Sequence, residues 1–301
     1  MRILITGGAG FIGSHIAEFF QGKAEVRVLD NLRSGYVRNL ENLDVEFIRG
    51  DVRDRVTVSR AVQGVDYIFH LAAMISVPES MTKPLECVDI NVNGTLTVLE
   101  EAARAGVKKL VFSSSAAVYG DNPVMPKREE MLPEPKSPYA ITKLDGEYYC
   151  NMFRHEGKLN TVALRYFNVF GPRQDPKSAY AAAVPIFAFK AIHGEKMVIY
   201  GDGEQSRDFV FVRDIARANA FMAQNDESGV FNVAYGKSLS INELVNRIRF
   251  ITDSQSEVEH APERAGDIRH SLASVERLSR TGFQPEYSFG GALAETINYY
   301  K

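Results

Sequence analysis

The chain has 301 residues, of which 45% are hydrophobic, and this is enough to bury a large core in one domain with a smaller lobe. Its formal net charge of -3 provides no basic field, so we do not expect a nucleic-acid partner. Cys87 and Cys150 are too few for a disulfide framework, and no apolar run suits a signal peptide or membrane span, so we expect a cytosolic protein without a membrane anchor.

The first half of the chain alternates short β-branched runs with longer amphipathic stretches, which is typical of a parallel sheet wrapped by helices. The fold class that we predict is therefore α/β, a doubly wound parallel sheet of the Rossmann type. Strands are predicted over residues 2–6, 25–29, 45–48, 67–71, 109–113 and 161–166. Helices are predicted over 11–20, 54–62, 84–105 and 138–156, with a proline-rich loop over 121–138.

After Tyr166 the predicted elements become shorter. We expect a helix over 186–193, and Ser240 and Glu243 have the spacing of a capping box that begins another helix. Residues 209–212, 214–224 and 230–233 resemble strand, helix and strand returning to the central sheet. The domains that we predict are 1–165 plus about 209–238, and a smaller lobe of about 166–208 and 239–301.

A glycine-rich segment, residues 6–13, follows the first predicted strand and opens a predicted helix. In this pattern Gly7 permits the tight turn, Gly10 lets the backbone approach a pyrophosphate, and Gly13 allows close packing of helix on strand. The helix N-terminus then offers N–H groups and partial positive charge to an anion. An ordinary tight turn between strand and helix remains the alternative.

Acidic residues end the next two predicted strands. Asp30 could accept hydrogen bonds from an adenosine ribose and repel a 2′-phosphate, which favours NAD over NADP, although Arg33 could soften that preference. Asp51 and Val52 could meet the adenine edge. Ordinary turn residues at strand ends are the alternative for Asp30 and, even more, for Asp51.

Tyr139 and Lys143 lie four residues apart in a predicted helix, so the phenol and the ammonium can face the same space. A nearby cation stabilises phenolate and would lower the tyrosine pKa from about 10 towards neutrality. Such a phenol can take the proton of a sugar hydroxyl while hydride moves to nicotinamide. The same spacing is also common on the surfaces of helices.

Three serines, Ser113, Ser114 and Ser115, end the predicted strand before that helix. They would lie at the carboxyl edge of the sheet, where open α/β sheets bind ligands, although a polar strand end or a helix cap is an equal alternative. The glycine turn, the serines and the Tyr139/Lys143 pair occur in the right order on the right elements, which argues against coincidence.

Together these motifs resemble the extended short-chain dehydrogenase/reductase family, and within it the nucleotide-sugar 4-epimerases. The resemblance spans nearly the whole chain. It implies inversion at C4 of a UDP-hexose through a 4-keto intermediate, with tightly held NAD. The motifs are residues 6–14, His70-Leu71-Ala72-Ala73, Ser113 to Gly120, Tyr139 with Lys143, and Gly201-Asp202-Gly203 with Arg207-Asp208-Phe209.

The resemblance also implies individual roles. Tyr139 would be the catalytic acid/base, Lys143 would bind the nicotinamide ribose, and Ser115 would hydrogen-bond the reacting hydroxyl. Cofactor-binding residues would be Gly7, Gly10, Phe11, Ile12, Gly13, Asp30, Asn31, Ser34, Gly35, Asp51, Val52, Leu71, Ala72, Ala73, Lys83, Ser113, Tyr139, Lys143 and Tyr166. Substrate-binding residues would be Ser76, Ser115, Asn168, Arg207, Arg264, Asp267 and Ser271.

Within the substrate set, Asn168 would contact the diphosphate and Asp267 the uridine ribose. Arg207 and Arg264 suit phosphate because a guanidinium pairs two oxygens at once, although solvated surface arginines are the alternative. Ser271 matches a pocket position that is bulky in epimerases confined to UDP-glucose and UDP-galactose. A serine there predicts room for an N-acetyl group.

Ala116 and Ala117 stand where related dehydratases and decarboxylases carry acidic residues, and a methyl group cannot act as an acid or base. This favours the epimerase over its alternatives, another nucleotide-sugar oxidoreductase such as a reductase or dehydratase, or a non-catalytic NAD-binding sensor. The six histidines lack ligand spacing, so we expect no metal. The family resemblance further implies a homodimer paired through the helices at 84–105 and 138–156, whose Tyr148 and Met152 are predicted to lie in the core.

Overall fold

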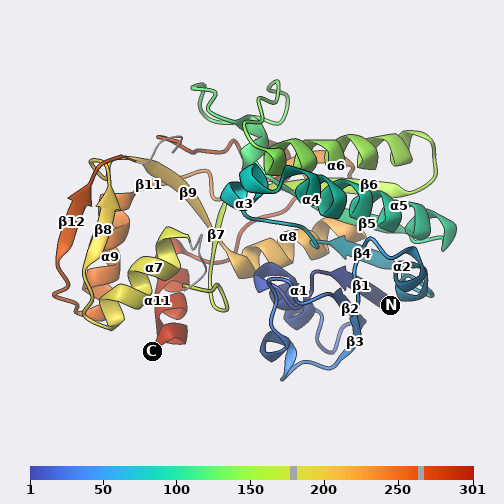
Figure 1. Ribbon diagram of the computed structural model, residues 1–301, viewed down its shortest axis with the longest axis horizontal. Helices are drawn as coiled ribbons and strands as arrows, with labels where there is room; N and C mark the ends of the chain where they lie inside the picture. The colour runs from blue at the N-terminus through green and yellow to red at the C-terminus, as the bar shows by residue number, and fades with distance from the viewer. Residues whose placement is uncertain (177–181, 264–267) are drawn as a thin grey trace.

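The computed structural model describes residues 1–176, 182–263 and 268–301 (Figure 1). Its central feature is a seven-stranded sheet in the order β10-β6-β5-β4-β1-β2-β3, and every neighbouring pair is parallel. The strands are β1 (Arg2–Thr6), β2 (Glu25–Asp30), β3 (Val45–Arg49), β4 (Tyr67–His70), β5 (Lys109–Ser115), β6 (Asn160–Tyr166) and β10 (Gly229–Val233).

Helices cover both faces of this sheet, which explains why its strands are nearly continuous apolar runs such as the fully buried Ile3, Leu4 and Ile5. One face packs against α1 (Phe11–Phe19) and α8 (Val212–Gln224), and the other against α2 (Arg55–Ala61), α5 (Gly94–Arg104) and α6 (Pro138–His155). The α/β class, the six first strands and the parallel arrangement are as predicted.

The strand order reverses between β1 and β4, so the loops after these two strands part at the carboxyl edge of the sheet. Open α/β sheets bind their ligands in the crevice at such a point. The remaining elements on this side are the 3₁₀ turns η1 (Val37–Leu40) and η3 (Ala116–Tyr119) and the short helix α3 (Val77–Thr82).

The rest of the chain forms two small sheets with their own core (Figure 1). Strands β7 (Asn168–Phe170), β9 (Ser206–Phe211) and β11 (Ser238–Ser240) form one, and β8 (Met197–Tyr200) pairs with β12 (Val258–Ala261) in the other. The helices of this part are α7 (Ala183–Ile192), α9 (Ile241–Thr252) and α11 (Phe289–Tyr300), whereas α10 (Glu276–Arg280) packs against β10, with Leu278 in the core of the central sheet. The capping box at Ser240 is confirmed.

Three predictions about this architecture are wrong. Strand β9 does not return to the central sheet but pairs with β7 and β11, because an apolar run does not reveal its partner. The helix predicted over 84–105 is interrupted by a π-helical turn, η2 (Asp89–Asn93), between α4 (Pro84–Val88) and α5. Tyr148 and Met152 are 60% and 40% exposed on α6, not buried in the core.

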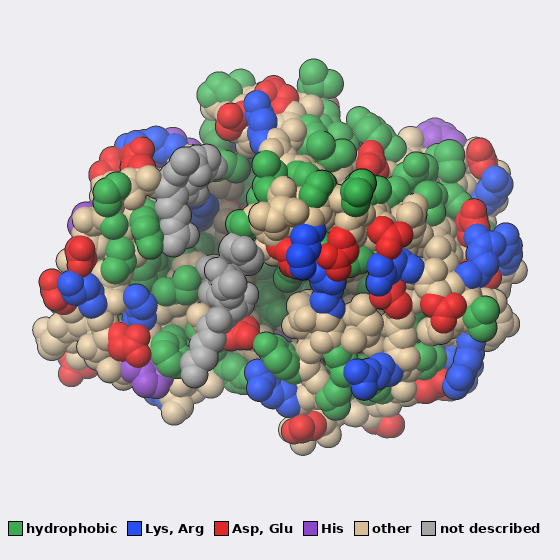
Figure 2. Space-filling view, in the orientation of Figure 1, with side chains coloured by type: hydrophobic (Ala, Val, Ile, Leu, Met, Phe, Trp, Pro, Cys, Tyr) green, Lys and Arg blue, Asp and Glu red, His purple; other side chains and the backbone are tan. Residues whose placement is uncertain are grey.

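On the face shown in Figure 2, basic and acidic side chains are interspersed, and hydrophobic side chains gather over the helices α3 to α6. None of the helices in the described ranges combines the length and the apolar character that a membrane span requires. Within those ranges, no group of three or more His, Cys, Asp or Glu side chains is arranged to hold a metal ion.

Candidate active site

The glycine turn between β1 and α1 is packed backbone against backbone. Gly7 has a φ of 72°, and a Cβ placed on it would lie 2.8 Å from the Ala72 nitrogen. A Cβ on Gly13 would lie 2.3 Å from the Gly7 carbonyl oxygen. Neither contact can be relieved by moving a side chain, so the turn requires glycine at both positions.

Helix α1 begins behind this turn with Gly10 as its N-cap, and among the described residues no side chain caps it. No acidic residue occupies its first turn either. The first N–H groups of the helix and its partial positive charge are thus available to an anion such as a pyrophosphate.

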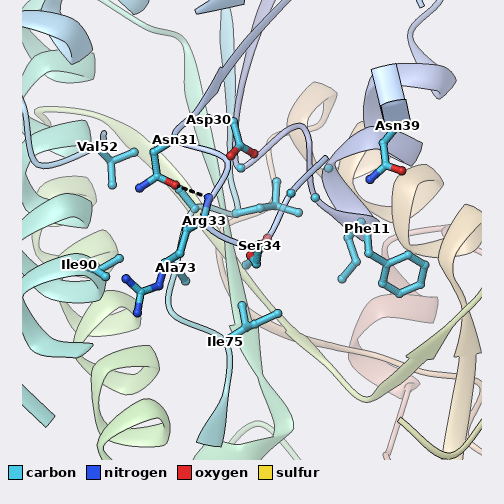
Figure 3. Close-up of a pocket in the computed structure, with 18 of the residues that line it drawn as sticks. Phe11, Asp30, Asn31, Arg33, Ser34, Asn39, Val52, Ala73, Ile75 and Ile90 are labelled. Carbon is cyan, nitrogen blue, oxygen red and sulfur yellow. Dashed lines mark hydrogen bonds between the residues drawn. The ribbon is translucent and has the colours of Figure 1, made fainter. Parts of the chain in front are cut away.

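A cavity of about 590 Å³ opens in front of the turn (Figure 3). Every predicted cofactor-binding residue except Lys83 lines it. Figure 3 shows Val52 and Ile90 on one side of the cavity, Phe11 on the other, and Asp30 at the end of β2. Lys83 instead forms ion pairs with Glu79 and Glu86 at 3.4 and 3.7 Å.

Asp30 is buried at the end of β2, and its two carboxylate oxygens accept the backbone N–H groups of Ala9 and Leu32 at 3.0 and 2.7 Å. Burial raises the pKa of this carboxyl, and the two N–H groups oppose that rise. Arg33, which could have attracted a 2′-phosphate, is bound to Glu79 at 2.9 Å and Glu86 at 2.6 Å. Its charge is therefore balanced within the chain.

Helix α6 delivers the predicted catalytic pair to the wall of the cavity. Ser137 caps the helix by accepting the Ala140 N–H at 3.2 Å, and Tyr139 and Lys143 then lie one turn apart. The Lys143 ammonium is 5.9 Å from the centre of the Tyr139 ring and donates a hydrogen bond to the Ser113 carbonyl at 2.8 Å. The structure thus brings together the two residues that the spacing placed on one face.

The expected lowering of the Tyr139 pKa is not what the free protein shows. Burial raises the pKa of the phenol, while the neighbouring Ser115 hydroxyl opposes the rise. Burial also lowers the pKa of Lys143 to about 8, because a desolvated ammonium is costly. The sequence pattern indicated the cation near Tyr139 but not the burial of its phenol, and burial has the larger effect on the Tyr139 pKa.

The three serines at the end of β5 have separate roles. The Ser113 hydroxyl meets the Tyr166 hydroxyl at 3.0 Å, and Tyr166 also donates to Asn219 at 2.9 Å. The Ser115 hydroxyl accepts the Ala117 N–H at 3.1 Å and lies beside Tyr139. Ser115 is therefore a helix cap, as one interpretation of these serines predicted, and its hydrogen bond to a substrate stays a prediction.

The predicted substrate residues that the structure describes gather mainly around β9. Asn168 of β7 donates to the Asp208 carbonyl at 3.1 Å, and the Ser271 N–H donates to the Ser206 carbonyl at 3.0 Å. The Arg207 guanidinium contacts the Ser206 carbonyl at 3.0 Å. Ser76 lies apart from this group and caps α3 by accepting the Glu79 N–H. Arg264 and Asp267 lie outside the described residues.

Several residues that line the cavity were missed by the sequence analysis. Tyr36 lies on the loop after β2, and its hydroxyl donates to Asp175 at 2.9 Å. Arg173 and Gln174 reach the cavity from the segment after β7. The Gly171-Pro172 turn directly after a short strand was the only local signal for this segment.

Comparison with known proteins identifies the family of the chain. Residues 3–234 match the model of the NAD dependent epimerase/dehydratase family. The chain belongs to this family. A UDP-glucose 4-epimerase of Mycolicibacterium smegmatis is 38% identical, and the match covers 100% of this chain and 99% of that protein.

Two solved structures of relatives superpose on nearly the whole chain. One is a UDP-N-acetylglucosamine 4-epimerase from Methanobrevibacter ruminantium, in complex with UDP-N-acetylmuramic acid, with a TM-score of 0.96, 44% identity, and 99% and 97% of the two chains covered. The other is a Thermus thermophilus UDP-glucose 4-epimerase in complex with NAD, with a TM-score of 0.92, 38% identity, and 100% and 99% covered. These relatives have the same fold over their full length.

NAD is the cofactor of this family, and the residues of the chain fit it. The glycine turn packs without room for a Cβ on Gly7 or Gly13, and the N-terminus of α1 lines the cavity, where its N–H groups can bind a pyrophosphate. The buried Asp30 disfavours the 2′-phosphate of NADP. We conclude that the protein is an NAD-dependent enzyme of the epimerase/dehydratase family.

Proposed function

We propose that the protein is a UDP-hexose 4-epimerase, which oxidises C4 of the sugar to a ketone and then reduces it from the opposite face. Tyr139, Lys143 and Ser115 carry this proposal, because Tyr139 and Lys143 line a cavity that suits a dinucleotide and Ser115 lies beside the Tyr139 phenol. When bound, NAD supplies the acceptor for the C4 hydride and later returns the same hydride. Net redox change is zero, so NAD can stay bound throughout.

The residues of the chain manage the proton of the C4 hydroxyl. Tyr139 as phenolate takes that proton as the hydride leaves, and as phenol it returns the proton when the ketone is reduced. Lys143 is held in place by the Ser113 carbonyl, and Ser115 lies where it can hydrogen-bond the same hydroxyl. Burial raises the pKa of Tyr139, and the Ser115 hydroxyl opposes that rise. A cation near the ring, here the Lys143 ammonium, also favours the phenolate.

The turn η3 beside Tyr139 supports epimerisation over elimination or decarboxylation. It carries Ala116 and Ala117, whose methyl groups can neither donate nor accept a proton. The one titratable side chain of this turn, Tyr119, is buried with its hydroxyl bound to Asn232, so Ala116 and Ala117 leave return of the hydride as the simplest fate of a 4-keto sugar.

The direct test is to incubate the purified protein, without added cofactor, separately with UDP-glucose, UDP-galactose, UDP-N-acetylglucosamine and UDP-N-acetylgalactosamine, and to separate the products. We expect each active substrate to reach an equilibrium mixture of its C4 epimers. In a parallel reaction with added NAD(H), stoichiometric consumption of the cofactor would instead indicate a reductase or dehydrogenase, and loss of water from the sugar in either reaction would indicate a dehydratase.

We propose further that the pocket accepts N-acetylated sugars. Ser271 is half-buried beside β9, and its side chain is small where a bulky residue would restrict the sugar. Replacement of Ser271 by tyrosine should abolish turnover of the N-acetylated pair and spare UDP-glucose and UDP-galactose. The matched control, Ser271→Ala, should retain both activities. An equal loss of turnover on both sugar types in the tyrosine variant would refute the proposal that the size of residue 271 selects the sugar.

We propose the domain division given above, with NAD held by residues 1–165 plus about 209–238 and the UDP-sugar by the remainder. We also propose a homodimer paired through α5 and α6. The exposed Ile141, Tyr148 and Met152 of α6 support this pairing, because they form an apolar surface on a helix that is otherwise packed on the sheet. Gel filtration with light scattering tests it, and a monomer at micromolar concentration would exclude it.

A further inference from the structure

Helix α6 contacts the end of β5 at three successive turns. Tyr139 lies beside Ser115, the Lys143 ammonium donates to the Ser113 carbonyl at 2.8 Å, and Glu147 accepts the Ser114 hydroxyl at 2.5 Å. The three helix residues are four positions apart, so they form a single stripe down one face. The first two belong to the proposed chemistry, but the third has no role in it.

Glu147 is part of a fully buried ion pair. Its carboxylate receives two hydrogen bonds from Arg165 of β6, at 2.8 and 2.7 Å, and both side chains are 3% exposed. Arg165 is the register partner of Ser114, so the pair spans from α6 across two adjacent strands. Such a buried pair is a costly way to gain stability, because desolvation of the two charges offsets most of their attraction.

The pair also connects the catalytic helix to the chain near the predicted substrate residues. The Arg165 guanidinium lies 4.7 Å from the centre of the Tyr119 ring, and the Tyr119 hydroxyl donates to Asn232 at 2.7 Å. The Asn232 amide in turn donates to the carbonyls of Lys127 and Ser274 at 2.9 and 3.2 Å. Ser274 is three residues from Ser271.

Close packing makes this stripe sensitive to small shifts. Gly146 lies next to Glu147, and a Cβ placed on it would be 2.2 Å from the Phe112 ring of β5. Helix α6 therefore lies as near to the strand as a glycine allows. A displacement of α6 along β5 would move Tyr139, Lys143 and Glu147 together.

On the basis of the epimerase reaction proposed above, we propose that the Glu147–Arg165 ion pair is a positioning element, which fixes the register of α6 on β5 so that the Tyr139 phenol and the Lys143 ammonium meet the sugar and the nicotinamide together. Neither Glu147 nor Arg165 lines the dinucleotide cavity. Their effect on the reaction passes through the helix and through Ser114. A misplacement of about 1 Å can cost roughly 100-fold in rate, so the geometry of this stripe matters for catalysis.

The test uses the NAD-loaded enzyme with both charges removed, in the double variant Glu147→Met/Arg165→Met. Methionine matches glutamate in length and fills the space of the aliphatic stem of arginine, and the double replacement leaves no buried charge unpaired, so the fold should persist. We expect kcat to fall by roughly 10- to 100-fold with a change in KM below about threefold. A milder variant, Ser114→Ala, removes only the hydroxyl between Glu147 and β5. Its kcat should also fall, by roughly threefold or more.

A second readout does not depend on turnover. In protein labelled with ¹³C at the tyrosine ζ carbon, the Tyr139 resonance is identified by its loss in Tyr139→Phe and then titrated with pH. Displacement from Ser115 and Lys143 removes groups that favour the phenolate, so we expect the Tyr139 pKa to rise in both variants.

A purely structural ion pair would give a different result. The double variant would then lose thermal stability while the folded enzyme kept its kcat and its Tyr139 titration, and that outcome overturns the proposal. If the double variant does not fold, an unchanged titration in Ser114→Ala overturns it equally. If the wild-type enzyme interconverts no UDP-hexose, the proposed function fails, while the titration still decides the positioning role.

Discussion

The dinucleotide cavity and the predicted substrate region around β9 are built by different means. At the cavity, backbone meets backbone, because a Cβ on Gly13 would lie 2.3 Å from the Gly7 carbonyl. Around β9, the buried carboxylate of Asp208 forms hydrogen bonds with two separate segments of the chain. The Asp208 side chain accepts the N–H groups of Tyr235, Gly236 and Ala273 at 3.0 to 3.1 Å.

This difference predicts how each region should respond to a substitution or to a change of pH. A contact between backbone atoms cannot relax, so one added methyl group should disrupt cofactor binding abruptly. Hydrogen bonds to a carboxylate weaken when it is protonated, so the substrate region should respond gradually to pH.

The largest effect is expected from Tyr139→Phe. Loss of the hydroxyl removes the proposed acid/base but leaves the glycine turn and the hydrogen bonds to Asp208 intact, so kcat should fall by about 1,000-fold. Binding of NAD and UDP-sugar, measured by calorimetry, should change by less than about threefold. Retained interconversion would exclude Tyr139 from its assigned role.

Gly13→Ala tests the rigidity of the cavity. The added methyl group must displace backbone, so we expect about 100-fold weaker NAD binding and a loss of about 2 to 3 kcal/mol in the free energy of unfolding. Calorimetric titration with NAD and urea denaturation measure the two quantities.

The matched control for that variant is Gly290→Ala in α11. A Cβ at Gly290 meets no described atom within 4 Å, and its φ does not lie in the left-handed region. This control should be neutral or slightly stabilising. Equal behaviour of the two variants would contradict the steric account of the glycine turn.

The same contrast explains what could be predicted from the sequence. The turn at Gly7, Asp30 at the end of β2, and the Tyr139/Lys143 pair are local patterns whose geometry follows from one strand and its next helix. Their placement around one cavity follows from the parallel order of the sheet.

Features that depend on distant parts of the chain could not be predicted in this way. The partner of β9 is one example, and the contact between Tyr36 and Asp175, which are 139 positions apart, is another. The direction of the Tyr139 pKa shift also depends on the total burial of the phenol, which the spacing to Lys143 does not report.

The Asp208 cluster should give a pH dependence that the glycine turn lacks. Burial raises the Asp208 pKa from 3.8 to about 6, so below that pH the protonated carboxyl holds its backbone N–H groups less well. We expect KM for the UDP-sugar to be roughly fivefold higher at pH 5 than at pH 7.5, while the affinity for NAD changes less. Steady-state kinetics and NAD titrations across this range measure both.

The free energy of unfolding should change in the opposite direction, with the contribution of Asp208 decreasing as the pH rises. Because the folded-state pKa is above the unfolded value, the stabilising contribution of Asp208 is complete below pH 3.8 and is lost as the pH rises through about 6. Asp208→Asn should lack this part of the pH dependence of unfolding. If wild type and Asp208→Asn show parallel stability profiles from pH 4 to pH 7, Asp208 does not titrate as described.

The smallest effect is expected at Arg33, the cavity residue that the sequence analysis considered as a partner for a 2′-phosphate. Arg33 is held by Glu79 and Glu86, and the three side chains are about one-third exposed, so each ion pair contributes little. Glu79→Gln/Glu86→Gln frees the guanidinium for a 2′-phosphate. We expect NADP to bind roughly two- to fivefold more tightly, with NAD unchanged within about twofold, as measured by fluorescence titration.

The effect should stay small because Asp30 remains in place and still opposes the 2′-phosphate. Glu276→Gln, which removes a carboxylate from an exposed ion pair with Arg280 on α10, is the control for a general change in surface charge. If that control raises NADP affinity equally, the gain is not due to Arg33. If the double variant instead prefers NADP to NAD, side chains rather than the glycine turn and Asp30 decide the cofactor, and the contrast between the two regions fails.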